Sequence, residues 1–166
     1  MGRVRGDRDG VNMAQENEKA PDVTLTGAEG EQVRLGDFKG QKLVVYFYPK
    51  DDTSGCTREA QDFTALAEEF EKVGTWVIGV SKDSSKSHAK FRDKYDLKVR
   101  LLSDADGSAC EAFGTWVEKN MYGRKYMGIE RATFLIDRDG VVKRAWRKVK
   151  VPGHAQEVLE AARALP

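Results

Sequence analysis

Cys56 is the side chain of this sequence best placed for covalent chemistry. It follows an apolar run and a loop that contains Pro49 and Thr53, and it stands where a long helical pattern begins. The first N–H groups of a helix lack intrahelical partners and lie at the positive end of the helix dipole, so they stabilise a thiolate. Cys56 is therefore a candidate nucleophile; the alternative is a small, inert apolar residue.

Residues close to Cys56 in the chain can assist or oppose such a thiolate. The Thr53 hydroxyl can hydrogen-bond to the sulfur or to a bound oxygen, and Pro49 can shield the sulfur from water. Asp51 and Asp52 oppose it, because nearby negative charge disfavours an anionic sulfur. We therefore expect a positive group to reach the site from elsewhere in the chain.

The remaining cysteine and histidine content excludes other kinds of site. Cys110 is the only other cysteine, which rules out a disulfide-rich secreted scaffold. His88 and His154 are scattered relative to the cysteines, whereas tetrahedral zinc needs clustered ligands. No metal is expected.

Composition argues against nucleic-acid and membrane partners. Lys and Arg total 28 against 27 acidic residues, so no global field attracts polyanions. The basic stretch 143–148 is predicted to be the solvated face of a strand. No apolar run reaches the roughly 18 residues that a membrane-spanning helix needs.

The length of 166 residues suits a single domain. Residues 1–19 are polar and lack the apolar segment of a secretory signal. We predict that 1–19 are a disordered extension or a remnant of cloning, with Met13 as a possible natural start, and that 20–166 form the domain.

The elements that must position Cys56 alternate along the chain. Residues 43–48 are continuously apolar or aromatic, typical of a strand buried on both faces, and the helical pattern after Cys56 runs to about Val73. Further strands are predicted at 23–26, 32–35, 76–81, 99–102, 132–137 and 141–146, and helices at 84–95, 107–113 and 154–165. This order predicts an α/β, thioredoxin-like fold: a central mixed sheet flanked by helices, with an N-terminal β-hairpin.

Two segments of the sequence resemble a known family. Residues 47–60, with the pattern Pro49-x-x-x-Thr53-x-x-Cys56, closely resemble the active-site segment of peroxiredoxins, nearest to the Q subfamily, also called bacterioferritin comigratory protein. Residues 128–137 are similar to the strand that carries that subfamily's active-site arginine. The resemblance extends from about Pro21 to the C-terminus.

The resemblance implies a role for each matching residue. Cys56 would be the peroxidatic cysteine, which attacks a peroxide and becomes a sulfenic acid. Thr53 would hold the peroxide, Pro49 would shield the sulfur, and Arg131 would be the missing positive group. Without the family, Arg131 would be taken as an exposed strand residue. Glu59 matches a residue that often orients this site, and an ordinary acid in the first turn of a helix is an equal interpretation.

The sequence departs from the subfamily pattern at two positions. Gln61 stands where many members carry a second, resolving cysteine, and Ser54 stands where proline is common. Cys110 is then the only internal candidate to resolve the sulfenic acid, which would require Cα atoms within about 7 Å. We favour a buried structural thiol at Cys110, and recycling of Cys56 by thioredoxin, glutaredoxin or a small thiol.

The resemblance therefore implies a thioredoxin-dependent peroxidase, an antioxidant enzyme of cell redox homeostasis. It would reduce hydrogen peroxide and organic hydroperoxides without metal, haem or flavin, as a cytoplasmic monomer. A disulfide reductase would need a Cys-x-x-Cys pattern, which Cys56 lacks. The non-enzymatic alternative is a redox sensor or holdase switched by oxidation of Cys56, which would oxidise once and stall.

Overall fold

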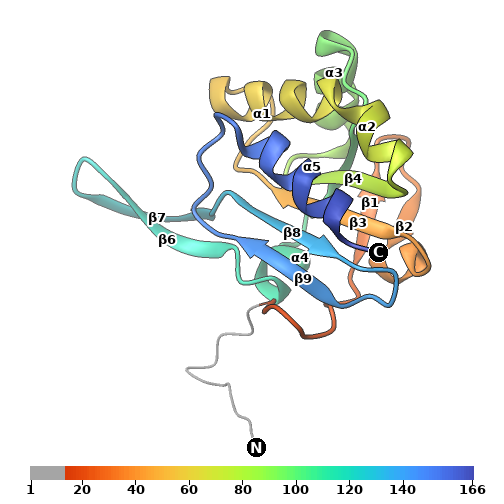
Figure 1. Cartoon of the computed structure of the whole chain (residues 1–166). Helices are drawn as coiled ribbons and strands as arrows, with labels where there is room; N and C mark the ends of the chain where they lie inside the picture. Colours follow the sequence, from red (N-terminus) through yellow and green to blue (C-terminus); the bar gives the residue numbers. More distant parts are fainter. Residues whose placement is uncertain (1–13) are drawn as a thin grey trace, which may run out of the picture.

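A mixed seven-stranded sheet forms the centre of the protein, for which a computed structural model describes residues 14–166 (Figure 1). The strand order is β2-β1-β5-β4-β3-β8-β9. β3 (Lys42–Phe47) pairs in parallel with β4 (Thr75–Ser81) and antiparallel with β8 (Ala132–Ile136). All six residues of β3 are buried, as the apolar run predicts.

The other strands of the sheet extend it on both sides of β3. On the far side of β4 lie β5 (Arg100–Ser103) and the N-terminal hairpin of β1 (Thr24–Gly27) and β2 (Gln32–Arg34). β9 (Val142–Trp146) pairs antiparallel with β8 and forms the opposite edge.

Helices cover the two faces of the sheet unequally. α1 (Ser54–Ala65), α2 (Ala67–Lys72), α3 (Ser85–Tyr95) and α5 (His154–Ala164) pack on one face, and α4 (Ser108–Ala112) and the 3-10 helix η2 (Leu35–Phe38) pack on the other. The alternation along β3 divides the core: Val44 and Tyr46 point to the first face, and Val45 and Phe47 to the second.

This architecture confirms the predicted thioredoxin-like α/β fold, although the first long helix differs from the prediction. The helix predicted to run to Val73 is divided at Leu66, which leaves the helical conformation at φ −103° and ψ 9°. Its amide donates to the Phe63 carbonyl, three residues back, and α2 begins at the next residue. Apolar residues keep their helical spacing on both sides of Leu66, so the sequence pattern could not reveal the break between α1 and α2.

A two-stranded hairpin was missed. β6 (Trp116–Met121) and β7 (Arg124–Ile129) pair antiparallel and extend away from the rest of the molecule (Figure 1). Tyr122 and Gly123 join them, both with positive φ, at 54° and 80°. Two such residues make the turn that suits the twist of a hairpin. Most hairpin residues are exposed, so the sequence carries no alternating apolar pattern.

The predicted domain boundary at residue 20 lies too late. Ala14 is buried in the core, the Asn17 amide donates to the Val142 carbonyl at 2.7 Å, and the Val142 amide donates to the Glu18 carbonyl at 2.9 Å. Residues 14–19 therefore lie along β9 as part of the domain. The prediction for residues 1–13 lies outside the described residues.

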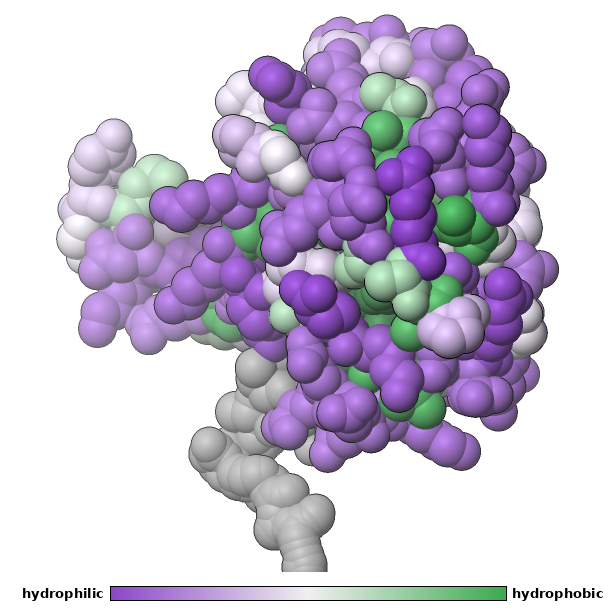
Figure 2. All heavy atoms as spheres, viewed as in Figure 1, coloured by the Kyte–Doolittle hydropathy of each residue, from purple (hydrophilic) through white to green (hydrophobic). Residues whose placement is uncertain are grey.

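The surface is mostly hydrophilic on the face shown in Figure 2. The basic stretch predicted as a strand face belongs to the edge strand β9 and the residues after it, with Arg144 exposed. Within residues 14–166, the helices are too short or too polar to cross a membrane.

Candidate active site

Cys56 is the third residue of α1, at the end where the helix dipole is positive. The Thr57 amide donates to the Thr53 carbonyl at 2.8 Å as the first backbone bond of the helix, so the preceding amides face the site. The Cys56 side chain is buried, with 2% of the residue exposed. The sulfur is thus buried near the positive end of the helix dipole, away from bulk water.

The sheet brings Arg131 to Cys56 from far along the chain. β3 and β8 run antiparallel with Phe47 opposite Ala132, so the start of β8 lies beside the end of β3, where the loop to Cys56 begins. Arg131 Nη2 donates to Cys56 Sγ at 3.4 Å. A cation at this distance stabilises the anionic form of the sulfur.

Gly55 makes room for the guanidinium. A Cβ at this position would lie 3.2 Å from Arg131 Nη2, tighter than an ordinary contact. A side chain there would push Arg131 away from its place beside Cys56. The sequence interpretation gave Gly55 no role beyond the loop, because the contact depends on a residue of another strand.

Glu59 holds the other side of the guanidinium. Arg131 Nη1 donates to Glu59 Oε1 at 2.7 Å, and Glu59 lies one turn after Cys56 on α1. Burial raises the pKa of Glu59 to about 7, although the charge and hydrogen bond of Arg131 act in the opposite direction. Glu59 Oε2 is buried and has no hydrogen-bond partner, which fits a carboxyl group that is costly to ionise.

Arg131 itself stays charged. Burial lowers the pKa of Arg131. The charges of Glu59 and Cys56 and the hydrogen bonds to both raise it by more, so the net pKa is above the ordinary value. The guanidinium therefore forms a fixed fork between a carboxyl group and a sulfur, a geometry that lysine cannot reproduce.

The other two predicted site residues lie in the loop ahead of α1. Thr53 occupies the N-cap position, and its hydroxyl donates to the Lys50 carbonyl at 2.8 Å rather than capping the helix. Its oxygen lone pairs stay available to accept a hydrogen bond. Pro49 is half-buried, two residues after the last residue of β3.

The carboxylate of Asp51 lies in a buried polar network. It accepts hydrogen bonds from Tyr48 Oη at 2.5 Å and Ser87 Oγ at 2.8 Å, and His88 Nδ1 lies 2.7 Å from it. His88 is fully buried, and its Nε2 lies 3.1 Å from the Leu102 carbonyl. This network, which the sequence interpretation missed, ties the loop between β3 and α1 to α3.

Asp52 is also held by α3. Its backbone is left-handed at φ 58°, a conformation that aspartate tolerates better than most residues. Its carboxylate accepts from Tyr95 Oη at 2.6 Å and Lys94 Nζ at 2.8 Å, which lowers its pKa. Both aspartates that opposed a thiolate in the sequence interpretation therefore have partners elsewhere.

Cys110 lies on the other face of the sheet. It packs in the core with Phe47 and Phe113, whereas Cys56 packs with Tyr46 and Phe63. Burial raises the pKa of the Cys110 thiol well above its ordinary range, and a hydrogen bond and charge from Asp104 add to this. The structure thus does not bring Cys110 to the site, and β3 stands between the two sulfurs.

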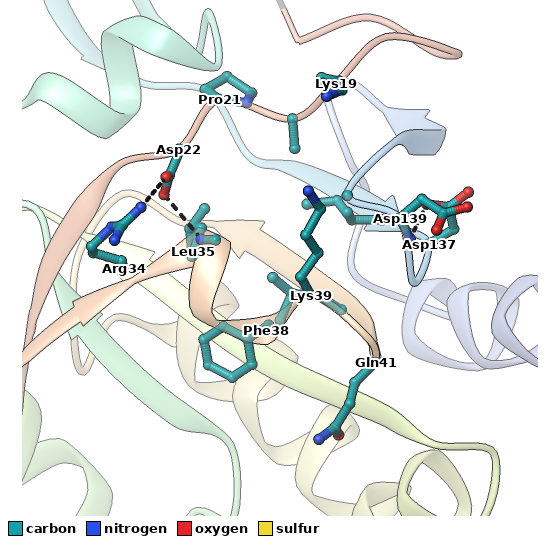
Figure 3. A pocket seen from close by; sticks show the side chains of 15 residues that line it. Lys19, Pro21, Asp22, Arg34, Leu35, Phe38, Lys39, Gln41, Asp137 and Asp139 are labelled. Atoms are coloured by element: carbon teal, nitrogen blue, oxygen red, sulfur yellow. Dashed lines mark hydrogen bonds and ion pairs between the residues drawn. The ribbon is translucent and has the colours of Figure 1, made fainter.

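The pocket of Figure 3 is separate from this site. Its volume is about 340 Å³, and Leu43, near the start of β3, helps to line it, whereas Cys56 follows the other end of that strand. Asp22 accepts from Arg34 Nη2 at 2.6 Å and from the Gly36 amide at 2.9 Å at its edge. Within residues 14–166, no group of three or more His, Cys, Asp or Glu side chains is arranged to hold a metal ion.

The raised pKa of Glu59 predicts a pH dependence of stability. An unfolded glutamate ionises near 4.5 and Glu59 in the folded protein near 7, so the folded state binds more protons between these values. The free energy of unfolding should therefore fall as pH rises from about 4.5 to 7, by up to about 3 kcal/mol from this residue. Urea unfolding of wild type and Glu59→Gln across this range should show a smaller fall in the variant.

The control for this measurement is Glu71→Gln, at an exposed position on α2. It should retain the wild-type slope. His154, whose burial lowers its pKa to about 4, contributes equally to all three proteins. Parallel curves for wild type and Glu59→Gln would contradict the prediction.

Comparisons with known proteins agree on one family. A sequence model of the AhpC/TSA family matches residues 17–145. The Putative peroxiredoxin bcp of Coxiella burnetii is 53% identical over 142 residues, which are 86% of this chain and 94% of that protein. Peroxiredoxin Bcp of Bacillus subtilis is 50% identical over 143 residues, 86% of this chain and 91% of that protein.

Solved structures are similar over almost the same extent. Xanthomonas campestris peroxiredoxin Q has a TM-score of 0.82 at 51% identity, covering 86% of this chain and 90% of its own. The bacterioferritin comigratory protein of the same organism, described in connection with alkyl peroxide reduction activity, has a TM-score of 0.85 at 47% identity. It covers 90% of this chain and 98% of its own.

Proposed function

Because this chain belongs to the AhpC/TSA family, we propose that it reduces hydrogen peroxide and organic hydroperoxides with Cys56 as the nucleophile. It is a thiol-dependent peroxidase of the peroxiredoxin type, like its relatives. The observation that carries the role of Cys56 is the 3.4 Å hydrogen bond from Arg131 Nη2 to its sulfur at the start of α1.

The first half of the reaction oxidises Cys56. The thiolate attacks the terminal oxygen of the hydroperoxide, an S–O bond forms and the O–O bond breaks. The second oxygen leaves with the bonding pair and takes up a proton, so the products are an alcohol (or water) and a Cys56 sulfenic acid. Arg131, already beside the sulfur, stabilises the negative charge that moves to the leaving oxygen.

Thr53 and Pro49 complete the assignment. With its own proton donated to the Lys50 carbonyl, the Thr53 oxygen accepts a hydrogen bond from the peroxide O–H and so orients the substrate. Pro49 borders the loop as a half-buried ring without an N–H group and limits the access of water. Glu59 is a positioning residue that acts by holding Arg131.

An external thiol completes the cycle in this proposal. Since Cys110 packs on the opposite face of the sheet, it acts as a structural thiol, and a second molecule must supply the resolving sulfur. That thiol attacks the Cys56 sulfenic acid, an S–S bond forms and water leaves. A further thiol then attacks the external sulfur of this mixed disulfide. A new disulfide forms between the two external thiols, and Cys56 leaves as a thiolate.

The reductant is a protein or small-molecule thiol, with thioredoxin as the first candidate and glutaredoxin or a small thiol as the others. Such thiols are kept reduced in the cytoplasm, where we place this protein. We propose that it acts as a monomer, since the site is assembled within one chain from α1, β8 and the loop between β3 and α1.

The recycling proposal is tested by Cys110→Ser. With a thioredoxin system as reductant, steady peroxide consumption should stay within about twofold of wild type, because distant sites without shared partners act independently. NADPH oxidation coupled to thioredoxin reductase measures the turnover. Cys110→Ala, measured in parallel, controls for a hydroxyl placed in the apolar core.

Two outcomes decide between mechanisms. A single burst of about one peroxide per chain in both Cys110 variants would mean that Cys110 resolves the sulfenic acid and that our assignment is wrong. A single burst in wild type itself would instead identify the redox sensor or holdase, which oxidises once and is not recycled.

A further inference from the structure

Lys119 is a cation near the active site that the proposed mechanism does not use. It lies on β6 of the exposed hairpin, directly opposite Tyr126 on β7. Since side chains alternate across a strand, it shares one face of the hairpin with Val117 and Gly128. β7 ends two residues before Arg131, so the base of the hairpin meets the site.

Gly128 directs the Lys119 side chain toward that base. A Cβ at Gly128 would lie 3.2 Å from Lys119 Cδ and 3.5 Å from Lys119 Cε. The lysine and the ring of Tyr126, whose Cε2 would lie 3.4 Å from that Cβ, therefore both lie over the glycine, and Gly128 is nearer to Arg131 along β7. The absence of a side chain at Gly128 is what permits this course.

Lys119 interacts electrostatically with the charged groups of the site. Burial lowers its pKa, the charge of Arg131 lowers it further, and the negative charges of Cys56 and Glu130 act against both. Both active-site groups are thus close enough to interact with the ammonium. A partly buried lysine beside an arginine destabilises the folded protein unless an anion compensates it.

Among residues 14–166, the side-chain ammonium of Lys119 has no hydrogen-bond or ion-pair partner. The nearby carboxylates are occupied: Glu59 accepts from Arg131 at 2.7 Å, and Glu130 accepts from Arg147 Nε at 3.0 Å and from the Lys148 amide at 2.8 Å. The Lys119 ammonium is therefore a cation beside the site that no side chain of residues 14–166 pairs with.

We propose that Lys119 is a specificity-determining residue that binds a carboxylate of the substrate, so that hydroperoxides carrying a carboxylate react faster than uncharged ones of the same length. The inference rests on the proposed function: the peroxide end contacts Cys56, Arg131 and Thr53, and the far end meets Lys119 at the base of the hairpin. Neutral peroxides react through the first contact alone.

The test compares acids with their esters. The probes are straight-chain acids with a terminal hydroperoxide, of increasing chain length, and the methyl ester of each, with hydrogen peroxide as the small neutral substrate. The rate constant for Cys56 oxidation is measured under pseudo-first-order conditions by trapping the remaining thiol. In wild type, the acid of best length should react about tenfold faster than its ester, a factor typical of one partly screened charge pair.

In Lys119→Met, the ratio of acid to ester should fall to about one, and the rate with hydrogen peroxide should fall by less than the rate with the acid. Lys119→Arg should keep the preference. The matched control is Lys125→Met, because Lys125 lies on the other face of the same hairpin and should leave the ratio unchanged. The wild-type ratio should also decline with added salt.

The proposal is overturned if no acid outpaces its ester in wild type, if the ratio is unchanged in Lys119→Met, or if Lys125→Met loses the preference equally. A loss with hydrogen peroxide as large as the loss with the acid would also refute it, because Lys119 would then act on the sulfur rather than on substrate charge. Failure of the proposed function is distinct, since wild-type Cys56 would then not react with hydrogen peroxide.

Discussion

Replacing Cys56 by serine should reduce peroxide turnover by a factor on the order of 10³ or more, because the reaction is lost with its nucleophile. A serine hydroxyl is not ionised at neutral pH and cannot cycle through a sulfenic acid. The replacement is close in size, and Arg131 Nη2 can donate to the new oxygen as it does to the sulfur, so the fold should be retained. Peroxide consumption with thioredoxin and circular dichroism of the same sample measure both effects.

The matched control for Cys56→Ser is Cys110→Ser, the same chemical change at the other cysteine. It should remain active, because its sulfur lies on the opposite face of the sheet. Peroxide turnover by folded Cys56→Ser at more than a few per cent of the wild-type rate would refute the assignment of the nucleophile.

Replacing Arg131 by methionine should lower the rate constant for Cys56 oxidation by about 10²–10³, the usual loss when one donor to a developing oxyanion is removed. Both functions of the guanidinium disappear together: the hydrogen bond to the sulfur and the charge beside the leaving oxygen. The rate of thiol loss after mixing with hydrogen peroxide measures the effect. Arg58→Met, which removes an exposed charge two residues after Cys56, should change the rate by less than about threefold.

A double variant separates catalysis from stability at this position. Arg131→Met leaves the buried Glu59 without its 2.7 Å partner and should therefore also destabilise the fold. Adding Glu59→Gln removes the buried group that can ionise and should restore part of the stability but none of the activity. Recovery of activity in the double variant would mean that Arg131 acts only by neutralising Glu59, contrary to our proposal.

Local patterns were sufficient for most of the fold. The buried strand β3, the α1 start at Cys56 and the hairpin of β8 and β9 each follow from apolar period or turn chemistry within a few residues. The hairpin of β6 and β7 could not be found in this way, because it packs little of its surface on the core and its strands carry mixed polar residues. The turn residues Tyr122 and Gly123 were its only local signal.

The loop between β3 and α1 also shows which features the sequence could predict and which it could not. The sequence alone placed Thr53 and Cys56 at a strand–loop–helix junction, since both are fixed by elements next to them in the chain. It did not show where the carboxylates of Asp51 and Asp52 would point. Their partners lie on α3, more than thirty residues away, and only packing of that helix decides that they leave the sulfur free.

The sequence by itself therefore determined that Cys56, the proposed nucleophile, stands at the positive end of a helix, because a helix terminus is a local property of the chain. Tertiary structure decided what surrounds the sulfur. The antiparallel pairing of β3 with β8 brings Arg131 to Cys56, and the alternation of side chains along β3 puts Cys110 on the opposite face. Strand neighbours and sheet faces are set by long-range pairing, which no local pattern encodes.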